Sequence, residues 1–225
     1  RNKAFCPYCG RTTELRNREH VPSRVFLDTP YPENLPIVYP CQKCNSGFSK
    51  DEEYVACMIE CAKFGSANVR AIEREKIRET MRHSPKLAAQ IGDAVGRSEI
   101  WSTPGEDRFR VTTIVRKLAM GHVAFELGEP ILAEPIGISF LPIKSLSHER
   151  LASFETPPAF SLLAEVGSRA LQRQVQSSTG TADWIIVQPD RYRYLTHFSD
   201  IVTVRSVISE FLACEVSWDR SRLHQ

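Results

Sequence analysis

Two Cys-x-x-Cys pairs, Cys6/Cys9 and Cys41/Cys44, constrain this chain more than any other feature of its sequence. Each pair can supply two thiolates to one metal ion from a tight turn, and Gly10 permits such a turn after the first pair. A redox dithiol is the alternative for one pair alone, but two pairs without a surrounding βαβ pattern favour a metal. Because four cysteines leave a tetrahedral zinc ion no open position for water, the pairs predict a structural zinc that supports folding.

Cysteine content also bears on the cellular compartment. The chain contains seven cysteines, an odd number, which favours a metal site in a reducing compartment over a set of disulfides. No run approaches the roughly 20 apolar residues that span a bilayer, and the first residues lack the apolar run of a signal peptide. We therefore expect a cytoplasmic protein with no membrane partner, although the start at Arg1 leaves open a targeting signal removed from the N-terminus.

The segment between the cysteine pairs is predicted to form two short strands, and the segment after them a helix. Prolines at 30, 32, 36 and 40 limit that stretch to extended or turn conformations, so we expect strands at 18–21 and 35–39 that pair with each other. Ser49 and Glu52 match the S-x-x-E capping box, and apolar residues then recur at helical spacing. This pattern predicts a helix from residue 49 to about residue 64.

Three polar residues near the cysteine pairs suit the hydrolysis of a phosphodiester. His20 carries an imidazole that, with an ordinary pKa near 6.5, can accept a proton from an attacking water molecule. Glu19 and Asn45 offer hard oxygen ligands, which favour Mg²⁺ or Mn²⁺ as a catalytic cation. Taken singly, a Glu-His dipeptide is usually a surface feature and an asparagine after a cysteine is usually a cap or turn residue. Their positions relative to the cysteine pairs favour a catalytic interpretation.

The order CPYCG, EH, ENL and CQKCN resembles that of the HNH endonuclease family, over roughly the first quarter to third of the chain. The resemblance implies a ββα-metal fold with a four-cysteine zinc site, His20 as the general base, and Glu19 and Asn45 as ligands of the catalytic cation. It further implies that Asn34 fixes the loop that carries His20. The chain differs from many relatives in having Glu before the base and Asn as the last motif residue. These differences leave the identity of the catalytic metal open.

Charge distribution points to nucleic acid more clearly than net charge does. A net charge of +2 is too small to identify a nucleic-acid-binding protein. Basic residues nevertheless crowd the N-terminal segment, where a solvated basic face is the alternative to phosphate binding. The basic side chains of that segment are Arg1, Lys3, Arg11, Arg16, Arg18 and Arg24, against the acidic Glu14 and Glu19. We predict that Arg16, Arg18, Arg24 and Lys50 contact nucleic acid, with double-stranded DNA as the expected partner.

The rest of the chain is predicted to be helical first and β-rich afterwards. Residues 68–83 are charged and helical in character, 85–95 read as a helix that ends at Gly96, and 109–127 form the best amphipathic helix. Lys117 lies off the apolar face of that helix, where phosphate contact and solvated charge both remain open. We interpret His122 as a core histidine, and Cys57, Cys61 and Cys214 as small core residues. Strands are predicted at 160–166, 171–176, 184–187, 192–198, 201–207 and 211–218.

These observations predict an α+β fold in three segments. Residues 1–66 form a zinc-stabilised ββα-metal module, 67–128 a helical segment with the long helix, and 129–225 an antiparallel sheet packed on the helices. The predicted function is a metal-dependent endonuclease of HNH type that hydrolyses DNA. The same chemistry on RNA and a non-catalytic zinc-ribbon nucleic-acid-binding module are the alternatives. The C-terminal segment is open to several roles: shaping a substrate channel, forming a homodimer or sensing a trigger.

Overall fold

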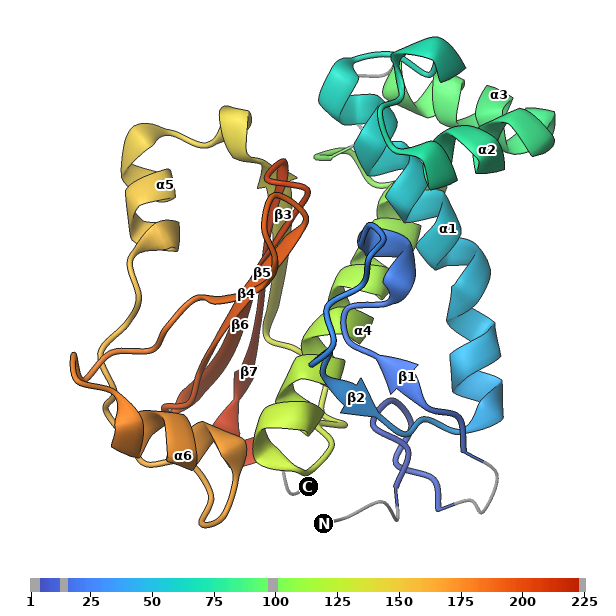
Figure 1. The fold of residues 1–225 in the computed structure, drawn as a ribbon. Helices are drawn as coiled ribbons and strands as arrows, with labels where there is room; N and C mark the ends of the chain where they lie inside the picture. The colour runs from blue at the N-terminus through green and yellow to red at the C-terminus, as the bar shows by residue number, and fades with distance from the viewer. Residues whose placement is uncertain (1–4, 13–15, 97–100, 223–225) are drawn as a thin grey trace.

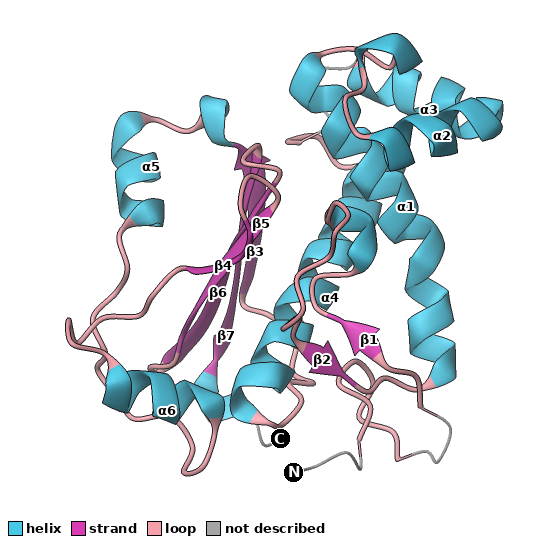
Figure 2. Ribbon diagram, viewed as in Figure 1, coloured by secondary structure: helices cyan, strands magenta, loops and turns pink. Residues whose placement is uncertain are grey.

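The computed structural model describes residues 5–12, 16–96 and 101–222, which form a mixed α+β fold (Figures 1 and 2). The helices are α1 (Gln42–Phe64), α2 (Glu75–His83), α3 (Pro85–Val95), α4 (Glu106–Leu127), α5 (His148–Glu155) and α6 (Arg169–Gln176). The strands are β1 (Glu19–His20), β2 (Ile37–Val38), β3 (Gly137–Pro142), β4 (Ile185–Gln188), β5 (Tyr192–His197), β6 (Ile201–Ile208) and β7 (Leu212–Asp219). Within this part of the chain, no helix is long and apolar enough to cross a membrane.

Helix α4 lies at the centre of the molecule, between the C-terminal sheet and the N-terminal module (Figure 1). It packs against β3, β5, β6 and β7 on one side and against α1 and β2 on the other. Its apolar residues, among them Val111, Ile114 and Leu118, are fully buried. Buried side chains of all three predicted segments therefore join one hydrophobic core.

The C-terminal sheet is antiparallel, with the strand order β3-β7-β6-β5-β4. Strand alternation gives it two different faces. Val202, Val204 and Trp218 are buried on the face that packs on α4. The opposite face carries charged pairs such as Arg205 with Glu215, and α5 lies over that face (Figure 1). The predicted antiparallel sheet packed on the long helix is confirmed.

Two of the predicted C-terminal strands are wrong. Residues 171–176 belong to α6, because the Ser168 hydroxyl caps that helix by accepting the backbone N–H of Leu171 at 3.0 Å. Residues 160–166 form no strand. The backbone N–H of Phe160 donates to the carbonyl of Gly180, which lies in another loop. Strand β3 and helix α5 were not predicted. The other predicted strands correspond to β4, β5, β6 and β7.

Helix α1 begins earlier than predicted. Cys41 is its N-cap, and the Cys41 sulfur accepts the backbone N–H of Cys44 at 3.5 Å. The helix therefore starts at Gln42, and Ser49 lies inside it, where the Ser49 hydroxyl donates to a carbonyl in the preceding turn. As a result, Asn45 sits in the first turn of α1 and not in a loop before it.

Several other predictions about single elements and residues are confirmed. Helix α3 has the predicted bounds, and the strands predicted at 18–21 and 35–39 pair as β1 and β2. His122 is fully buried and its Nε2 lies 2.9 Å from the Tyr192 hydroxyl, as expected of a core histidine. The cysteines outside the two pairs, Cys57, Cys61 and Cys214, are buried as well. The cytoplasmic location and the homodimer stay predictions.

Candidate metal centre and nuclease site

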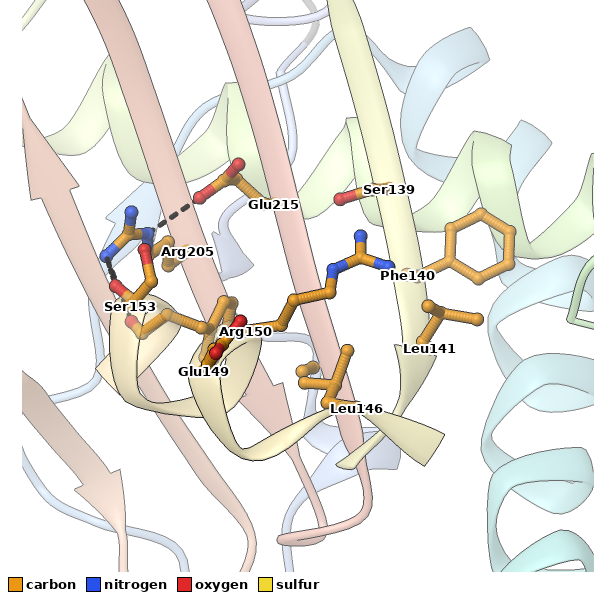
Figure 3. Close-up of a pocket in the computed structure, with 11 residues that line it drawn as sticks. Ser139, Phe140, Leu141, Leu146, Glu149, Arg150, Ser153, Arg205 and Glu215 are labelled. Atoms are coloured by element: carbon orange, nitrogen blue, oxygen red, sulfur yellow. Dashed lines mark hydrogen bonds and ion pairs between the residues drawn. The ribbon is translucent and has the colours of Figure 1, made fainter. Parts of the chain in front are cut away.

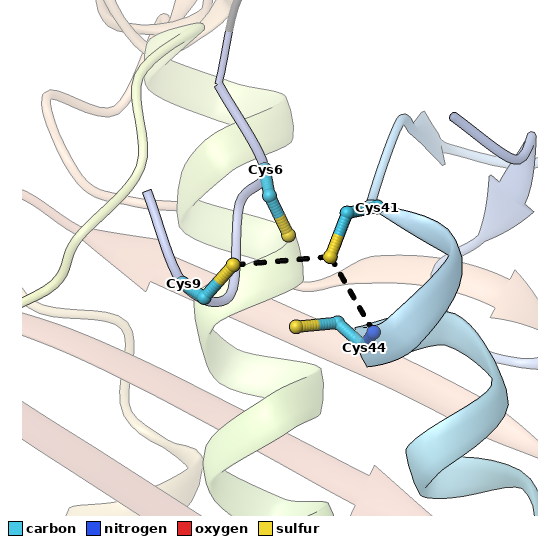
Figure 4. Close-up of side chains that lie close together, drawn as sticks. All are labelled: Cys6, Cys9, Cys41 and Cys44. Atoms are coloured by element: carbon cyan, nitrogen blue, oxygen red, sulfur yellow. Dashed lines mark hydrogen bonds between the residues drawn. The ribbon is translucent and has the colours of Figure 1, made fainter. Parts of the chain in front are cut away.

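The four paired cysteines converge on one point (Figure 4). Their sulfur atoms all lie within 4.8 Å of one another, and the sulfurs of Cys9 and Cys41 are 3.8 Å apart. A zinc ion bound at about 2.3 Å to four sulfurs in a tetrahedron separates them by about 3.8 Å. Cys6, Cys9, Cys41 and Cys44 therefore fit one structural metal ion.

Local structure places both cysteine pairs. Gly10 has a positive φ of 67°, and its N–H donates to the Cys6 carbonyl at 2.9 Å, which closes the first turn. The second pair lies at the start of α1, where the backbone N–H of Cys44 lowers the pKa of the Cys41 thiol to about 7. Burial raises the pKa of Cys6 instead. Metal binding must therefore release protons from the buried thiols, so the affinity for metal will rise with pH.

Strand β1 separates its two functional candidates. In the β1–β2 pair Glu19 lies opposite Val38 and His20 lies opposite Ile37, so the two side chains leave the sheet on opposite faces. Glu19 is only 8% exposed, whereas His20 is half-buried. The predicted cation ligand thus points into the protein and the predicted base towards the surface.

The Glu19 carboxylate is held by a lysine from α4. Its Oε1 accepts a hydrogen bond from the Lys117 ammonium, which also donates to Glu52 Oε1 and, at 2.9 Å, to the Ser23 hydroxyl. Burial raises the pKa of Glu19, and the Lys117 charge opposes that shift. Both expectations for Lys117 are wrong, because its side chain is 1% exposed and can reach neither solvent nor phosphate.

The predicted pair of cation ligands does not fit a catalytic cation in this arrangement. Glu19 already binds an ammonium in a site closed to solvent, and that positive charge repels a divalent ion at short range. Asn45 is half-buried in the first turn of α1, with its backbone N–H bonded to Cys41. We therefore derive no catalytic step through a cation held by Glu19.

His20 lies in a positive environment. Burial lowers its pKa, and the charges of Arg24 and Arg18 lower it further. Arg18 lies directly before β1, two residues from His20, while the exposed Arg24 lies over the ring of Tyr31, 5.1 Å from its centre. The Nδ1 atom of His20 is buried without a hydrogen-bond partner among the described residues. A neutral imidazole flanked by two arginines can accept a proton beside a bound phosphate.

The other predicted site residues lie on different elements. Asn34 is exposed and lines a groove of about 580 Å³ along β2 and the C-terminal end of α4, together with Arg18, Tyr39 and Arg169. The remaining predicted nucleic-acid contacts are Arg16, half-buried in a β-bridge with Cys41, and Lys50, exposed on α1. The expectations for Arg1, Lys3 and Glu14 lie outside the described residues.

A second hollow lies between α5 and the outer face of the C-terminal sheet (Figure 3). It has a volume of about 320 Å³. Arg205 on its floor is held by Glu215 at 2.7 Å and by carbonyls at the end of α5, while the side chain of Arg150 reaches across it (Figure 3). This hollow is far from the cysteine cluster in sequence and shares no lining residue with the groove along β2.

The partners of Glu19 have no recognisable signal in the sequence as a group. Glu52 matches a helix capping box, and Ser23 belongs to no motif. The sequence places Lys117 on a polar face of α4, although the structure buries it fully beside Glu52 and Ser23. The one available signal is the position of Lys117, three residues after the apolar Ile114 and directly before Leu118.

Comparisons of the chain with models of known protein families, with curated proteins and with solved structures found no match.

Proposed function

We propose that this protein is a zinc-stabilised endonuclease of HNH type that hydrolyses phosphodiester bonds in double-stranded DNA. The observation that carries the proposal is the half-buried His20 with its lowered pKa, flanked by Arg18 and Arg24, on a β-hairpin anchored beside the four-cysteine cluster. Such a site joins a proton acceptor and phosphate-binding groups on a fixed scaffold.

In the proposed reaction His20 acts as general base. Its neutral imidazole takes a proton from water as the water oxygen attacks phosphorus. The guanidinium groups of Arg18 and Arg24 bind the phosphate oxygens and stabilise the negative charge that grows in the transition state. The phosphorus–oxygen bond to the leaving sugar then breaks, and the leaving oxygen receives a proton from solvent. No step is assigned to a divalent cation, because Lys117 holds Glu19, and the assay below contains Mg²⁺ so that a requirement for a cation is measured.

The test is the variant His20→Ala, assayed on supercoiled plasmid with zinc-loaded protein and added Mg²⁺. Removal of a general base typically costs a factor of about 10²–10⁴, so cleavage should fall by that amount with zinc content unchanged. His83→Ala is the matched control, because His83 is exposed on α2 and contacts a backbone carbonyl of its own helix. Cleavage by His20→Ala at the rate of the unmodified protein would overturn the proposal.

A non-catalytic zinc module that binds nucleic acid is the second candidate, and the engagement of Glu19 by Lys117 favours it. This candidate predicts one metal ion per chain, binding of nucleic acid and no cleavage with any divalent cation. The same plasmid assay, run beside an RNA substrate and after removal of loosely bound metal, separates the candidates. Cleavage of RNA alone would keep the chemistry and change the substrate.

A further inference from the structure

Helix α4 inserts a lysine ammonium into the N-terminal module. The Lys117 nitrogen contacts residues of three other parts of the module: Glu19 on β1, Glu52 on α1 and Ser23 before the short turn that follows β1. It also lies over two aromatic rings, 5.5 Å from the centre of Tyr8 and 5.7 Å from that of Phe48. Tyr8 lies between Cys6 and Cys9 in the sequence, so the lysine lies beside a side chain of the first cysteine turn.

The ammonium is fully satisfied where it lies. A lysine has three N–H donors, and Glu19, Glu52 and Ser23 supply three acceptors. The two carboxylates are 8% and 12% exposed at their side chains, so little water competes for these bonds. Burying an ammonium is costly unless it is paired and hydrogen-bonded, and both conditions are met here.

The acceptors around Lys117 have the chemistry of a divalent-cation site. Two carboxylates and one hydroxyl are hard oxygen ligands of the kind that Mg²⁺ and Mn²⁺ prefer. With Lys117 present, two negative charges face one positive charge, and the space between the oxygens is taken by the ammonium.

We propose that Lys117 is a built-in cation, which permanently occupies the oxygen site formed by Glu19, Glu52 and Ser23 and excludes a divalent ion from it. Glu19 then has a positioning role: it fixes β1, and with it the neighbouring His20, to α4 and α1. The inference holds whether or not the chain cleaves nucleic acid, because it concerns what occupies the space between the two carboxylates.

The experiment measures Mn²⁺ binding to the zinc-loaded full chain by electron paramagnetic resonance and by thermal unfolding. Lys117→Ala removes the ammonium and opens space, and should gain one Mn²⁺ per chain that the unmodified protein does not bind. At free Mn²⁺ about 100 times the Kd, its unfolding midpoint should rise by about 5–10 °C. Zinc content, measured in the same samples, should stay constant.

Three variants make the result specific. Lys117→Met fills the space without a charge and should gain no Mn²⁺, and Lys117→Ala combined with Glu52→Gln should lose the gained ion. Glu19→Gln in an otherwise unmodified chain should leave any existing Mn²⁺ binding unchanged, and this test does not require a folded Lys117 variant. The proposal is overturned if Glu19→Gln abolishes Mn²⁺ binding by the otherwise unmodified chain, or if folded Lys117→Ala binds no additional ion.

Discussion

Glu19 and His20 are adjacent in β1, yet their side chains leave the sheet on opposite faces, the first towards Lys117 and the second towards Arg18 and Arg24. The pair is thereby divided between a buried ion network and a basic surface. Because β1 is only two residues long, fixing Glu19 also fixes the backbone that carries His20. One short strand therefore carries both the structural role of Glu19 and the proposed chemical role of His20.

The pH dependence of cleavage should follow His20. Its pKa is lowered by burial and by the two arginines. The imidazole is therefore already neutral, and able to act as a base, at pH values below the ordinary histidine pKa of 6.5. The rate should rise with pH through a pKa below 6.5 and then level off. Arg24→Gln removes a cation that disfavours the imidazolium, so it should raise the pKa and move the rise to higher pH. Profiles of kcat/KM against pH measure this shift, and movement to lower pH would contradict the assignment.

The features that could be predicted from sequence are those determined by neighbours along the chain. The cysteine pairs, the β1–β2 hairpin between prolines, and helix α3 with Pro85 at its start and Gly96 at its end all carry local signals. In β6 and β7, buried and more exposed residues alternate over residues 201–206 and 214–219. Each of these predictions needed no knowledge of tertiary contacts.

The features that could not be predicted depend on contacts between distant segments. Lys117 is separated from Glu19 by 98 positions, and no spacing rule links a lysine on one helix to a carboxylate on a remote strand. Residues 171–176 mix apolar and polar side chains that suit a strand or a helix, and the Ser168 cap decides for the helix. The start of α1 at Gln42, ahead of the predicted start at residue 49, could not be predicted either. Cys41 is the N-cap of the helix, and a thiol is not among the usual capping groups.

Loss of one cysteine of the cluster should remove the metal and unfold the N-terminal module. Cys41→Ala deletes one of the four sulfurs and the cap of α1 together, so zinc content should fall from one ion per chain towards none. Cys214→Ala is the control, because that cysteine is buried in β7 away from the cluster and should keep its zinc. Elemental analysis and circular dichroism measure both effects. Full zinc content in Cys41→Ala would exclude this cysteine as a ligand.

The buried carboxylate of Glu126 should depend on Arg173. Glu126 is fully buried on α4, accepts the Tyr194 hydroxyl at 2.7 Å and pairs with Arg173 of α6 at 3.1 Å. Arg173→Met leaves that charge uncompensated, at a cost of about 2–3 kcal/mol in the free energy of unfolding once the partial exposure of the arginine is allowed for. Adding Glu126→Leu should recover part of the loss. Urea unfolding measures the series, and equal stabilities for the single and double variants would argue against the coupling.

Gly121 on α4 should be intolerant of even one added methyl group. It lies one turn after Lys117, on the face of α4 that meets the N-terminal module, and a Cβ there would stand 2.9 Å from Val21 Cγ2 and 3.2 Å from the Tyr8 hydroxyl. Gly121→Ala should therefore lower the free energy of unfolding by about 1–3 kcal/mol, although alanine is the better helix former. Gly47→Ala on α1 is the matched control, because a Cβ at Gly47 meets nothing within 4 Å. That variant should instead stabilise the protein by about 0.5–1 kcal/mol. Opposite signs for the two substitutions in urea unfolding are the expected result, and stabilisation by both would show that α4 does not pack closely on the module.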